Sequence, residues 1–440
     1  MVAIIGAGIS GLSLAYFLQK NGVPYVLLEA SDRSGGYIWS EKKDDYLLEY
    51  GPNSLLADDK LLELIEELGL KEEMTPAEAV NKNRFIFRNG QYQRLPSKPQ
   101  ALLFNSFFSW KTKLAILKEL SHKGKGPENE SIAAFFARHF SQELVDYAVD
   151  PFVSGIYAGN PDQLLVEKTF GRILSMEREY GSIIRGFMKQ GKTTKRKVTF
   201  SFKEGIQSLP QQLAKKVDVR FNSRVTDIKK GENGFTLHTS NGAIEAENVV
   251  LALPSFKAAP IVESTYPDFA NALNNVNYPP MCAVHTAFKR EDVGHPLDGF
   301  GGLNPAKEKQ FAAGSIWSSS IFPHRAPKDR VLFNSFVGGA RNPAHTQKTD
   351  AEIKDTLTAE LTKAYNIKGK PVFQKVMRWE NAIPQYDKNI LPVHQALEAA
   401  KTDGLHVCAN WVDGVSVSDC INKARSLAEE FKKVSDKVSV

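Results

Sequence analysis

Val2–Leu12 reads VAIIGAGISGL, and this stretch decides the fold. Val2 to Ile5 is a short apolar run rich in β-branched residues, which predicts a strand, and apolar residues at helical spacing after the glycine turn predict a helix. In such a unit the first glycine permits the turn, the second lets the backbone approach a pyrophosphate, and the third lets the helix pack on the strand. The stretch therefore predicts a dinucleotide clamp with the phosphates at the helix N-terminus.

The next apolar run and the residues after it indicate which dinucleotide is bound. Tyr25 to Leu28 predicts a second strand that ends at Glu29, about 20 residues after the glycine turn, where a carboxylate accepts hydrogen bonds from an adenosine ribose. Arg33 to Gly36 then reads RSGG, which resembles the second phosphate motif, R-x-G-G, of the FAD-dependent amine oxidase superfamily. The chain has no second G-x-G-x-x-G after a strand and no S-G-G-C motif for a covalent flavin. We therefore predict one non-covalent FAD and electrons drawn from the substrate.

The composition limits the classes of protein to which the chain can belong. The chain has 440 residues, 42% hydrophobic and 24% charged, which suits a globular protein of two or three subdomains. Cys282, Cys408 and Cys420 lack the spacing of a zinc site or a disulfide framework, so we expect free thiols in a reducing cytosol. The nine histidines show no H-E-x-x-H spacing, no metal is expected, and His285 is interpreted as a core residue. The first strand follows Met1 directly and leaves no room for a signal segment, so the expected location is cytoplasmic.

Two segments are interpreted as a surface that touches a membrane. The longest uncharged apolar stretch, Pro99 to Trp110, is shorter than the roughly 18 residues of a spanning helix. Apolar residues recur at roughly helical spacing from Leu102 to Leu117 with lysines after them, which predicts an interfacial amphipathic helix. Tyr180 to Lys203 contains basic residues and no acidic ones, in a chain of net charge +6. A buried helix followed by a solvated loop is the alternative, and peripheral contact with the cytoplasmic face of the inner membrane is the expectation.

Longer segments match one family in order. They are EYGPNS at Glu49–Ser54, PFVSGIYAGNPDQL at Pro151–Leu164, PLDGFGGLNP at Pro296–Pro305, RWENAIPQY at Arg378–Tyr386 and ANWVDGVSVSDCI at Ala409–Ile421. A two-residue hairpin turn is also predicted at Asn89 and Gly90. These segments resemble the protoporphyrinogen oxidase family, flavin enzymes near the end of haem synthesis, over nearly the whole chain. At Asp387 to Ile390 the chain departs from the Gly-His that members commonly carry, which affects the expected loop and not the chemistry.

The resemblance implies a mixed α/β (α+β) fold of the flavin amine oxidase superfamily. Residues 1–80, 205–255 and 390–440 are expected to form a Rossmann-like FAD-binding domain. Residues 95–200 are expected to form a helical membrane-side subdomain, and residues 260–390 a substrate-binding domain.

The resemblance also implies an activity, the oxidation of protoporphyrinogen IX to protoporphyrin IX in haem biosynthesis. Six electrons leave in three flavin cycles, and oxygen or another acceptor takes them, with hydrogen peroxide formed from oxygen. Some bacterial members prefer coproporphyrinogen III, which gives coproporphyrin III, and the sequence leaves this alternative open. An amine or carotenoid oxidoreductase, or a binding protein like the Rab GDP-dissociation inhibitors, are further alternatives. A homodimer is expected from the resemblance alone, and no nucleic-acid partner is expected.

The resemblance places four residues against the substrate. A flat apolar macrocycle with propionate arms needs apolar walls and a few cations. Arg84 occupies the place of the family's active-site arginine and suits a bidentate pair with a carboxylate. Phe300, Gly301 and Leu303 match the segment that lines the macrocycle pocket, where Phe300 would stack on a pyrrole and Gly301 would let the ring come close. A solvent-facing arginine and a buried loop are the alternatives, and no residue is given a direct catalytic role.

The motifs and the resemblance together predict the cofactor contacts. These are Gly6, Ala7, Gly8, Ile9, Ser10, Gly11, Glu29, Ala30, Arg33, Gly36, Tyr37, Gly51, Pro52, Asn53, Ser54, Val225, Trp379, Val415, Ser416 and Val417. The last three precede an expected C-terminal helix, so their backbone amides are expected to face the isoalloxazine carbonyl.

Overall fold

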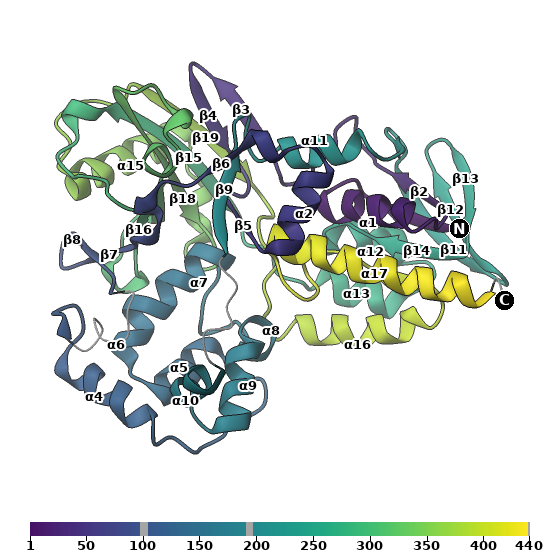
Figure 1. The fold of residues 1–440 in the computed structure, drawn as a ribbon, viewed down its shortest axis with the longest axis horizontal. Helices are drawn as coiled ribbons and strands as arrows, with labels where there is room; N and C mark the ends of the chain where they lie inside the picture. The colour runs from purple at the N-terminus through teal and green to yellow at the C-terminus, as the bar shows by residue number, and fades with distance from the viewer. Residues whose placement is uncertain (97–103, 191–196, 439–440) are drawn as a thin grey trace.

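The structure is a computed structural model, and it describes residues 1–96, 104–190 and 197–438. Figure 1 shows both termini at one end of an elongated molecule, a large sheet at the opposite upper end, and a group of helices below that sheet. The chain passes between these parts several times, so each part is built from segments distant in sequence.

A five-stranded parallel sheet forms the part near the termini. Its order is β10 (Val219–Arg220), β2 (Tyr25–Leu28), β1 (Val2–Ile5), β14 (Asn248–Leu251) and β20 (Leu405–Val407). One face of β1 packs with α1 (Ile9–Lys20) and α17 (Val417–Val438), and the other packs with α12 (Ser255–Val262), α13 (Pro267–Asn274) and α16 (Ile390–Lys401). Because helices cover both faces of the sheet, the central strand β1 is apolar at every position.

A seven-stranded mixed sheet forms the second part. Its order is β19 (Phe373–Trp379), β15 (Met281–Lys289), β18 (Arg330–Gly338), β17 (Ala312–Trp317), β16 (Gly301–Leu303), β7 (Phe85–Arg88) and β8 (Gln91–Arg94). Residues of α15 (Asp350–Tyr365) share one hydrophobic core with this sheet. The predicted turn at Asn89 and Gly90 is confirmed, because both residues have positive φ and join β7 to β8. The hairpin lies far in sequence from the other five strands, and it reaches them through parallel pairing of β7 with β16.

Helices from residue 110 to residue 190 form the third part. They are α4 (Trp110–Glu119), α5 (Ile132–His139), α6 (Gln142–Leu144), the π-helical turn η3 (Val145–Val149), α7 (Asp150–Tyr157), α8 (Val166–Thr169), α9 (Gly171–Tyr180) and α10 (Ile183–Gln190). The buried His139 lies between two carboxylates, with Nδ1 3.0 Å from Glu119 Oε1 and Nε2 3.1 Å from Glu177 Oε1. Burial alone would raise the pKa of Glu119, but hydrogen bonds from His139, Ser182 and two backbone amides hold it below its usual value. This network joins α4, α5, α9 and the start of α10.

The remaining elements connect these parts. The strands are β3 (Ser40–Lys43) with β4 (Tyr46–Glu49), β5 (Leu55–Ala57) with β9 (Val198–Phe202) and β6 (Met74–Pro76), and β11 (Val225–Gly231) with β12 (Gly234–Thr239) and β13 (Gly242–Ala246). The helices are α2 (Asp59–Glu67), η1 (Lys71–Glu73), η2 (Ala79–Lys82), α11 (Ser208–Ala214), η4 (Arg290–Asp292), η5 (Ala306–Glu308), α14 (Ser318–Ile321), η6 (Pro323–Arg325) and η7 (Pro343–Gln347).

Part of the expected membrane surface falls outside the described residues. Leu102 and Leu103 belong to the stretch 97–103, and the centre of the basic window is 191–196. Among the helices that the structure describes, none has an apolar stretch long enough to span a bilayer. The three cysteines are free, as predicted, and all three are buried.

Candidate cofactor and substrate site

Each glycine of the first motif has its own structural reason. Gly6 has φ +105°, a left-handed conformation, and a Cβ there would lie 2.8 Å from the carbonyl oxygen of Ala252. Gly11 lies where α1 crosses β1, and its Cβ would lie 1.9 Å from the Gly6 carbonyl oxygen. Gly8, at the N-cap of α1, has no described heavy atom within 4 Å of its Cβ position. Gly6 and Gly11 are therefore required by the turn and the packing, and Gly8 leaves room beside the helix N-terminus, next to Ile9 and Ser10.

Glu29 is fixed at the end of β2 beside this turn. Its Oε2 accepts a hydrogen bond from the Ala7 amide at 2.8 Å, and its Oε1 accepts from the Ser31 amide at 3.0 Å and from the Ser31 hydroxyl at 2.8 Å. The Ser223 amide donates to the carbonyl of Glu29, which brings the chain just before the buried Val225 to the same edge. The carboxylate is therefore aimed at the clamp, and the exposed Ala30 follows it.

The second motif lies directly against the first. Gly8 and Gly35 form a bridge, and the Gly36 Cβ position is 3.4 Å from Gly8 Cα. Arg33 Nη2 donates to the Gly36 carbonyl at 2.7 Å, and its guanidinium lies 5.0 Å from the centre of the Trp39 ring. In the structure Arg33 therefore shapes the loop that faces Gly8.

Tyr37 continues this surface toward the seven-stranded sheet. Its ring centre is 5.1 Å from that of Trp379, and its hydroxyl donates to the Asn381 carbonyl at 2.7 Å. Trp379 Nε1 donates to the Tyr50 carbonyl at 2.8 Å. Gly51 follows, and a Cβ there would lie 2.1 Å from the Tyr37 carbonyl oxygen, so only glycine fits. The segment Gly51–Ser54 thus starts beside Tyr37, which in turn contacts Trp379 of the seven-stranded sheet.

A second helix begins near the same place. Ser416 caps α17, because its hydroxyl accepts from the Asp419 amide at 3.1 Å while Asp419 accepts from the Ser416 amide at 3.2 Å. α1 and α17 run side by side with their N-terminal ends toward the middle of the molecule (Figure 1). Lys423 donates from within α17 to the carbonyls of Ala409 at 2.6 Å and Gly414 at 3.0 Å, which holds the loop before Val415–Val417.

These features fit FAD. Two helix N-termini supply amides and positive dipole ends for a pyrophosphate and for a flavin carbonyl. The open Cβ position of Gly8 would allow a phosphate to approach closely, and Glu29, beside the turn, would supply the carboxylate that accepts from a ribose in this motif. Residues from the ends of the chain and from its middle meet around one surface.

Strand pairing brings the predicted substrate residues together. In β7 and β16, Phe85 lies opposite Gly302, which places Arg84 at the level of Gly301, next to Phe300. The Arg84 guanidinium carbon is 4.1 Å from the centre of the Phe300 ring, and Nη1 donates to the Asn81 carbonyl. Burial lowers the pKa of Arg84 from its usual value. Gly301 is buried against β17, where a Cβ would lie 2.3 Å from the Ser315 carbonyl oxygen, so the sheet itself requires this glycine.

Two exposed apolar residues of α7 are not among the predicted site residues. A Cβ at Gly155 of α7 would lie 3.1 Å from Leu303 Cδ2, so this face of α7 approaches the predicted pocket wall. Phe152 and Ile156 share that face at helical spacing and are 48% and 40% exposed. The i, i+4 spacing of these two apolar residues within Pro151–Leu164 is the sequence pattern that could have identified them.

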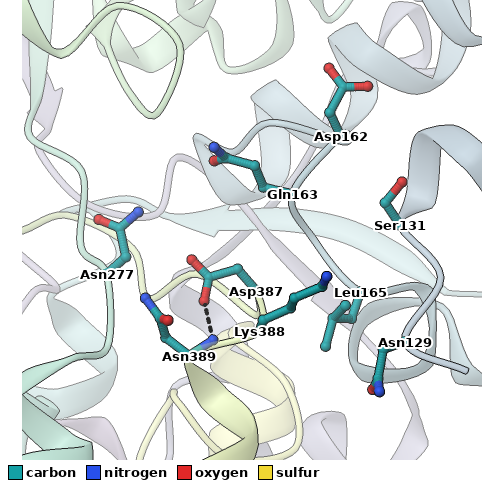
Figure 2. A pocket seen from close by; sticks show the side chains of 9 residues that line it. All are labelled: Asn129, Ser131, Asp162, Gln163, Leu165, Asn277, Asp387, Lys388 and Asn389. Atoms are coloured by element: carbon teal, nitrogen blue, oxygen red, sulfur yellow. Dashed lines mark hydrogen bonds between the residues drawn. The ribbon is translucent and has the colours of Figure 1, made fainter.

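One pocket in the described residues is mainly polar. It encloses about 640 Å³ and is lined by Asn129, Ser131, Asp162, Gln163, Leu165, Asn277, Asp387, Lys388 and Asn389 (Figure 2). Figure 2 shows Asp387 accepting from the Asn389 amide, a 2.9 Å contact that forms the turn before α16. Eight of its nine lining side chains are polar, which does not suit an apolar macrocycle. The departure from the family pattern at Asp387 therefore lies on this polar surface.

One cluster has the residue types of a metal site. Ligand atoms of His122, His139 and Glu177 lie within 4.8 Å of one another. Arg138 Nη1 lies 2.6 Å from Glu177 Oε1 and 3.1 Å from His122 Nε2, so a guanidinium already occupies the position between them. The cluster is accordingly explained as an ionic core of the helical part.

Comparison with known proteins gives the class. The family model described as flavin containing amine oxidoreductase matches residues 9–431, so the chain belongs to that family and is an FAD-dependent oxidoreductase. The mitochondrial protoporphyrinogen oxidase of Nicotiana tabacum is 33% identical over 97% of this chain and 94% of its own length. The chain is thus a member of the protoporphyrinogen oxidase family.

Two further comparisons complete this picture. The coproporphyrinogen III oxidase of Bacillus subtilis (strain 168) is 28% identical over 98% of this chain and 97% of its own length. The fold matches a solved Exiguobacterium structure assigned to the protoporphyrinogen oxidases, with a TM-score of 0.82, 22% identity and 98% coverage of both chains. The predicted family, fold class and cofactor are confirmed.

Proposed function

We propose that this protein oxidises protoporphyrinogen IX to protoporphyrin IX in haem biosynthesis. The observation that carries the proposal is the pairing of Arg84 with Phe300 on the sheet that also supplies Trp379 to the flavin side. A cation beside an apolar aromatic face suits a macrocycle with carboxylate arms, and relatives named for this activity match nearly the whole chain. Coproporphyrinogen III is the second candidate, because relatives named for that substrate also match over nearly their full length.

Each of the proposed site residues has a separate role in binding the substrate. Bound FAD supplies a two-electron acceptor for hydride, so six electrons require three turnovers. Arg84 holds a propionate, Phe300 stacks on a pyrrole, and Leu303 with Phe152 and Ile156 forms the apolar wall. In each turnover the substrate loses one hydride and one proton, and one oxygen molecule takes up the two electrons and two protons as hydrogen peroxide.

Side-by-side turnover of both porphyrinogens by the flavin-loaded protein tests this proposal. We expect porphyrin fluorescence to rise at least tenfold faster with protoporphyrinogen IX at equal low concentration, with one hydrogen peroxide formed per two electrons. Faster turnover of coproporphyrinogen III would replace the proposed substrate with the second candidate. Absence of turnover with both substrates would contradict the proposal.

We also propose peripheral contact with the cytoplasmic face of a membrane. Trp110, Leu114 and Leu117 lie on one face of α4 and are 72%, 39% and 46% exposed, and Phe104 before them is 87% exposed. Phe187 and Met188 of α10 are also exposed, with Lys189 next to them. Apolar side chains with basic neighbours are typical of an interfacial surface. By resemblance alone, we propose a homodimer as well.

Vesicle co-sedimentation checks the membrane contact. We expect the protein to sediment with anionic vesicles at low salt, and the double variant Trp110→Ser/Leu117→Ser to lose about tenfold in affinity because it buries less apolar surface. Val372→Ser, which changes an exposed apolar residue just before β19, is the matched control. Equal sedimentation of all three proteins, or none with wild type, would contradict the contact.

A further inference from the structure

Arg325 is a buried cation that the sequence analysis did not single out. It is the last residue of η6, between α14 and β18 of the seven-stranded sheet, and its side chain is 1% exposed. Its guanidinium carbon is 4.4 Å from the centre of the Phe322 ring, which covers one side of the group. An arginine so fully buried needs a set of acceptors around it.

The guanidinium finds those acceptors mainly on Asn53, in the predicted FAD-binding segment Gly51–Ser54. Nη1 donates to Asn53 Oδ1 at 2.6 Å, and Nη2 donates to the Asn53 carbonyl oxygen at 2.7 Å. Nη2 also lies 2.9 Å from Ser201 Oγ in β9 and 3.4 Å from Glu49 Oε1 at the end of β4. The fork therefore holds both the side chain and the backbone of Asn53.

The contact fixes which way the Asn53 amide points. An arginine side chain has only donors, so the amide oxygen of Asn53 must face it and the amide nitrogen must point elsewhere. Among the described residues, Asn53 Nδ2 is buried and has no hydrogen-bond partner. A buried donor without a protein partner is free to donate to a bound group or to a water.

The charges explain why this arrangement is costly. Glu49 is also 1% exposed, and it accepts from the Ser40 hydroxyl at 2.7 Å and from the Ile206 amide at 2.9 Å. Burial raises the pKa of Glu49 to about 7 against the opposing charge of Arg325, and burial lowers the pKa of Arg325 to about 10. Buried ion pairs contribute little net stability compared with apolar side chains of similar size. The pair therefore calls for a role other than stability.

The position of Asn53 suggests that role. Gly8 touches the loop at Gly36, Tyr37 follows that loop, and Gly51 packs against the Tyr37 carbonyl. Asn53 comes two residues later, so it continues the surface that starts at the clamp.

We propose that Arg325 is a positioning residue of the cofactor site, which orients Asn53 so that its amide Nδ2 donates to bound FAD. The inference rests on the predicted contact between the Gly51–Ser54 segment and the flavin. It also makes flavin binding depend on a distant segment, because Arg325 lies in η6, just before β18 of the seven-stranded sheet, and Asn53 lies in the predicted FAD-binding segment.

Cofactor titration of a small variant series tests this inference. Arg325→Met is expected to weaken FAD binding by tenfold to a hundredfold and to change the visible circular dichroism of the bound flavin. Arg325→Met also leaves Glu49 buried without a partner, so it destabilises the fold as well. Glu49→Gln/Arg325→Met removes both charges, and it should recover the unfolding temperature of the apoprotein but not the FAD affinity or the dichroism. Arg325→Lys keeps the charge without the fork and should be intermediate.

Two further variants separate this inference from the placement of Asn53. Asn53→Ala should reproduce the loss seen in Glu49→Gln/Arg325→Met, and combining all three changes should add little, because both act through one contact. Arg290→Met is the matched control. Arg290 lies in η4, directly after β15 of the seven-stranded sheet, and it donates to the carbonyls of Val293 and His295 and not to Asn53. Its flavin affinity and dichroism should stay at the wild-type values.

Two outcomes would overturn the inference. Wild-type flavin affinity and dichroism in Glu49→Gln/Arg325→Met, with a loss in Asn53→Ala, would show that Asn53 contacts the cofactor without needing Arg325. Wild-type values in both would show that the segment does not contact the flavin at all. Turnover of porphyrinogen is not needed for either reading, so the substrate proposal is tested separately.

Discussion

Gly11→Ala is expected to destabilise the apoprotein by about 3 kcal/mol, before any cofactor is added. A Cβ at this position would lie 1.9 Å from the Gly6 carbonyl oxygen and 3.2 Å from the Cβ of Ala252. Neither neighbour is a flexible side chain that can swing away, so α1 must shift off the parallel sheet. Thermal unfolding of the flavin-free protein measures the effect.

Gly8→Ala is the informative partner of that variant. Gly8 has φ −71°, which alanine adopts readily, and no described heavy atom lies within 4 Å of its Cβ position. The apoprotein should therefore unfold at the wild-type temperature. FAD affinity should fall by about a hundredfold, or about 2.7 kcal/mol, because a methyl group takes the space of the pyrophosphate.

Gly11→Ala and Gly8→Ala should differ in which property they lose, apoprotein stability or FAD affinity. Unfolding of the apoproteins and fluorescence titration with FAD should separate a packing defect at Gly11 from a binding defect at Gly8. Full FAD affinity in Gly8→Ala would mean that the pyrophosphate does not lie at the N-terminus of α1. An equal loss of apoprotein stability in both variants would contradict the different roles given to the two glycines.

Arg84→Leu is expected to raise the KM for porphyrinogen by roughly thirtyfold, because a charge-assisted hydrogen bond to a carboxylate contributes about 2 kcal/mol. Flavin content should not change, because Arg84 contacts Phe300 and the Asn81 carbonyl and not the clamp. A smaller change in kcat than in KM is expected, since the cation binds an arm of the substrate and not the reacting carbon. Steady-state kinetics by porphyrin fluorescence measure both constants.

The controls for Arg84 come from the same hairpin. Arg94→Leu removes an exposed arginine of β8 whose side chain contacts Asn83, and it should leave KM within about twofold of wild type. Arg84→Lys keeps the charge without the fork and should recover part of the loss. An unchanged KM in Arg84→Leu, or an equal increase in Arg94→Leu, would remove Arg84 from the substrate site.

The sequence by itself determined the local units of this protein. The strand, turn and helix of the clamp appear within Val2–Lys20, as predicted, and the hairpin turn lies at Asn89 and Gly90. Such units are readable because apolar spacing and turn chemistry act between residues close in the chain. The longer segments likewise sufficed for the family and the cofactor, since each carries its pattern in contiguous residues.

Only the tertiary structure decided how distant segments meet. Asn53 and Arg325 are 272 residues apart, and no local pattern marks a buried arginine that will hold an amide in another part of the molecule. The parallel pairing of β7 with β16 brings Arg84 near Phe300, and the antiparallel pairing of β16 with β17 packs Gly301 against Ser315. Phe152 and Ile156 are exposed on α7, and Gly155 of the same helix lies close to Leu303. These contacts depend on how sheets and helices pack across the whole chain, and neither composition nor periodicity records that arrangement.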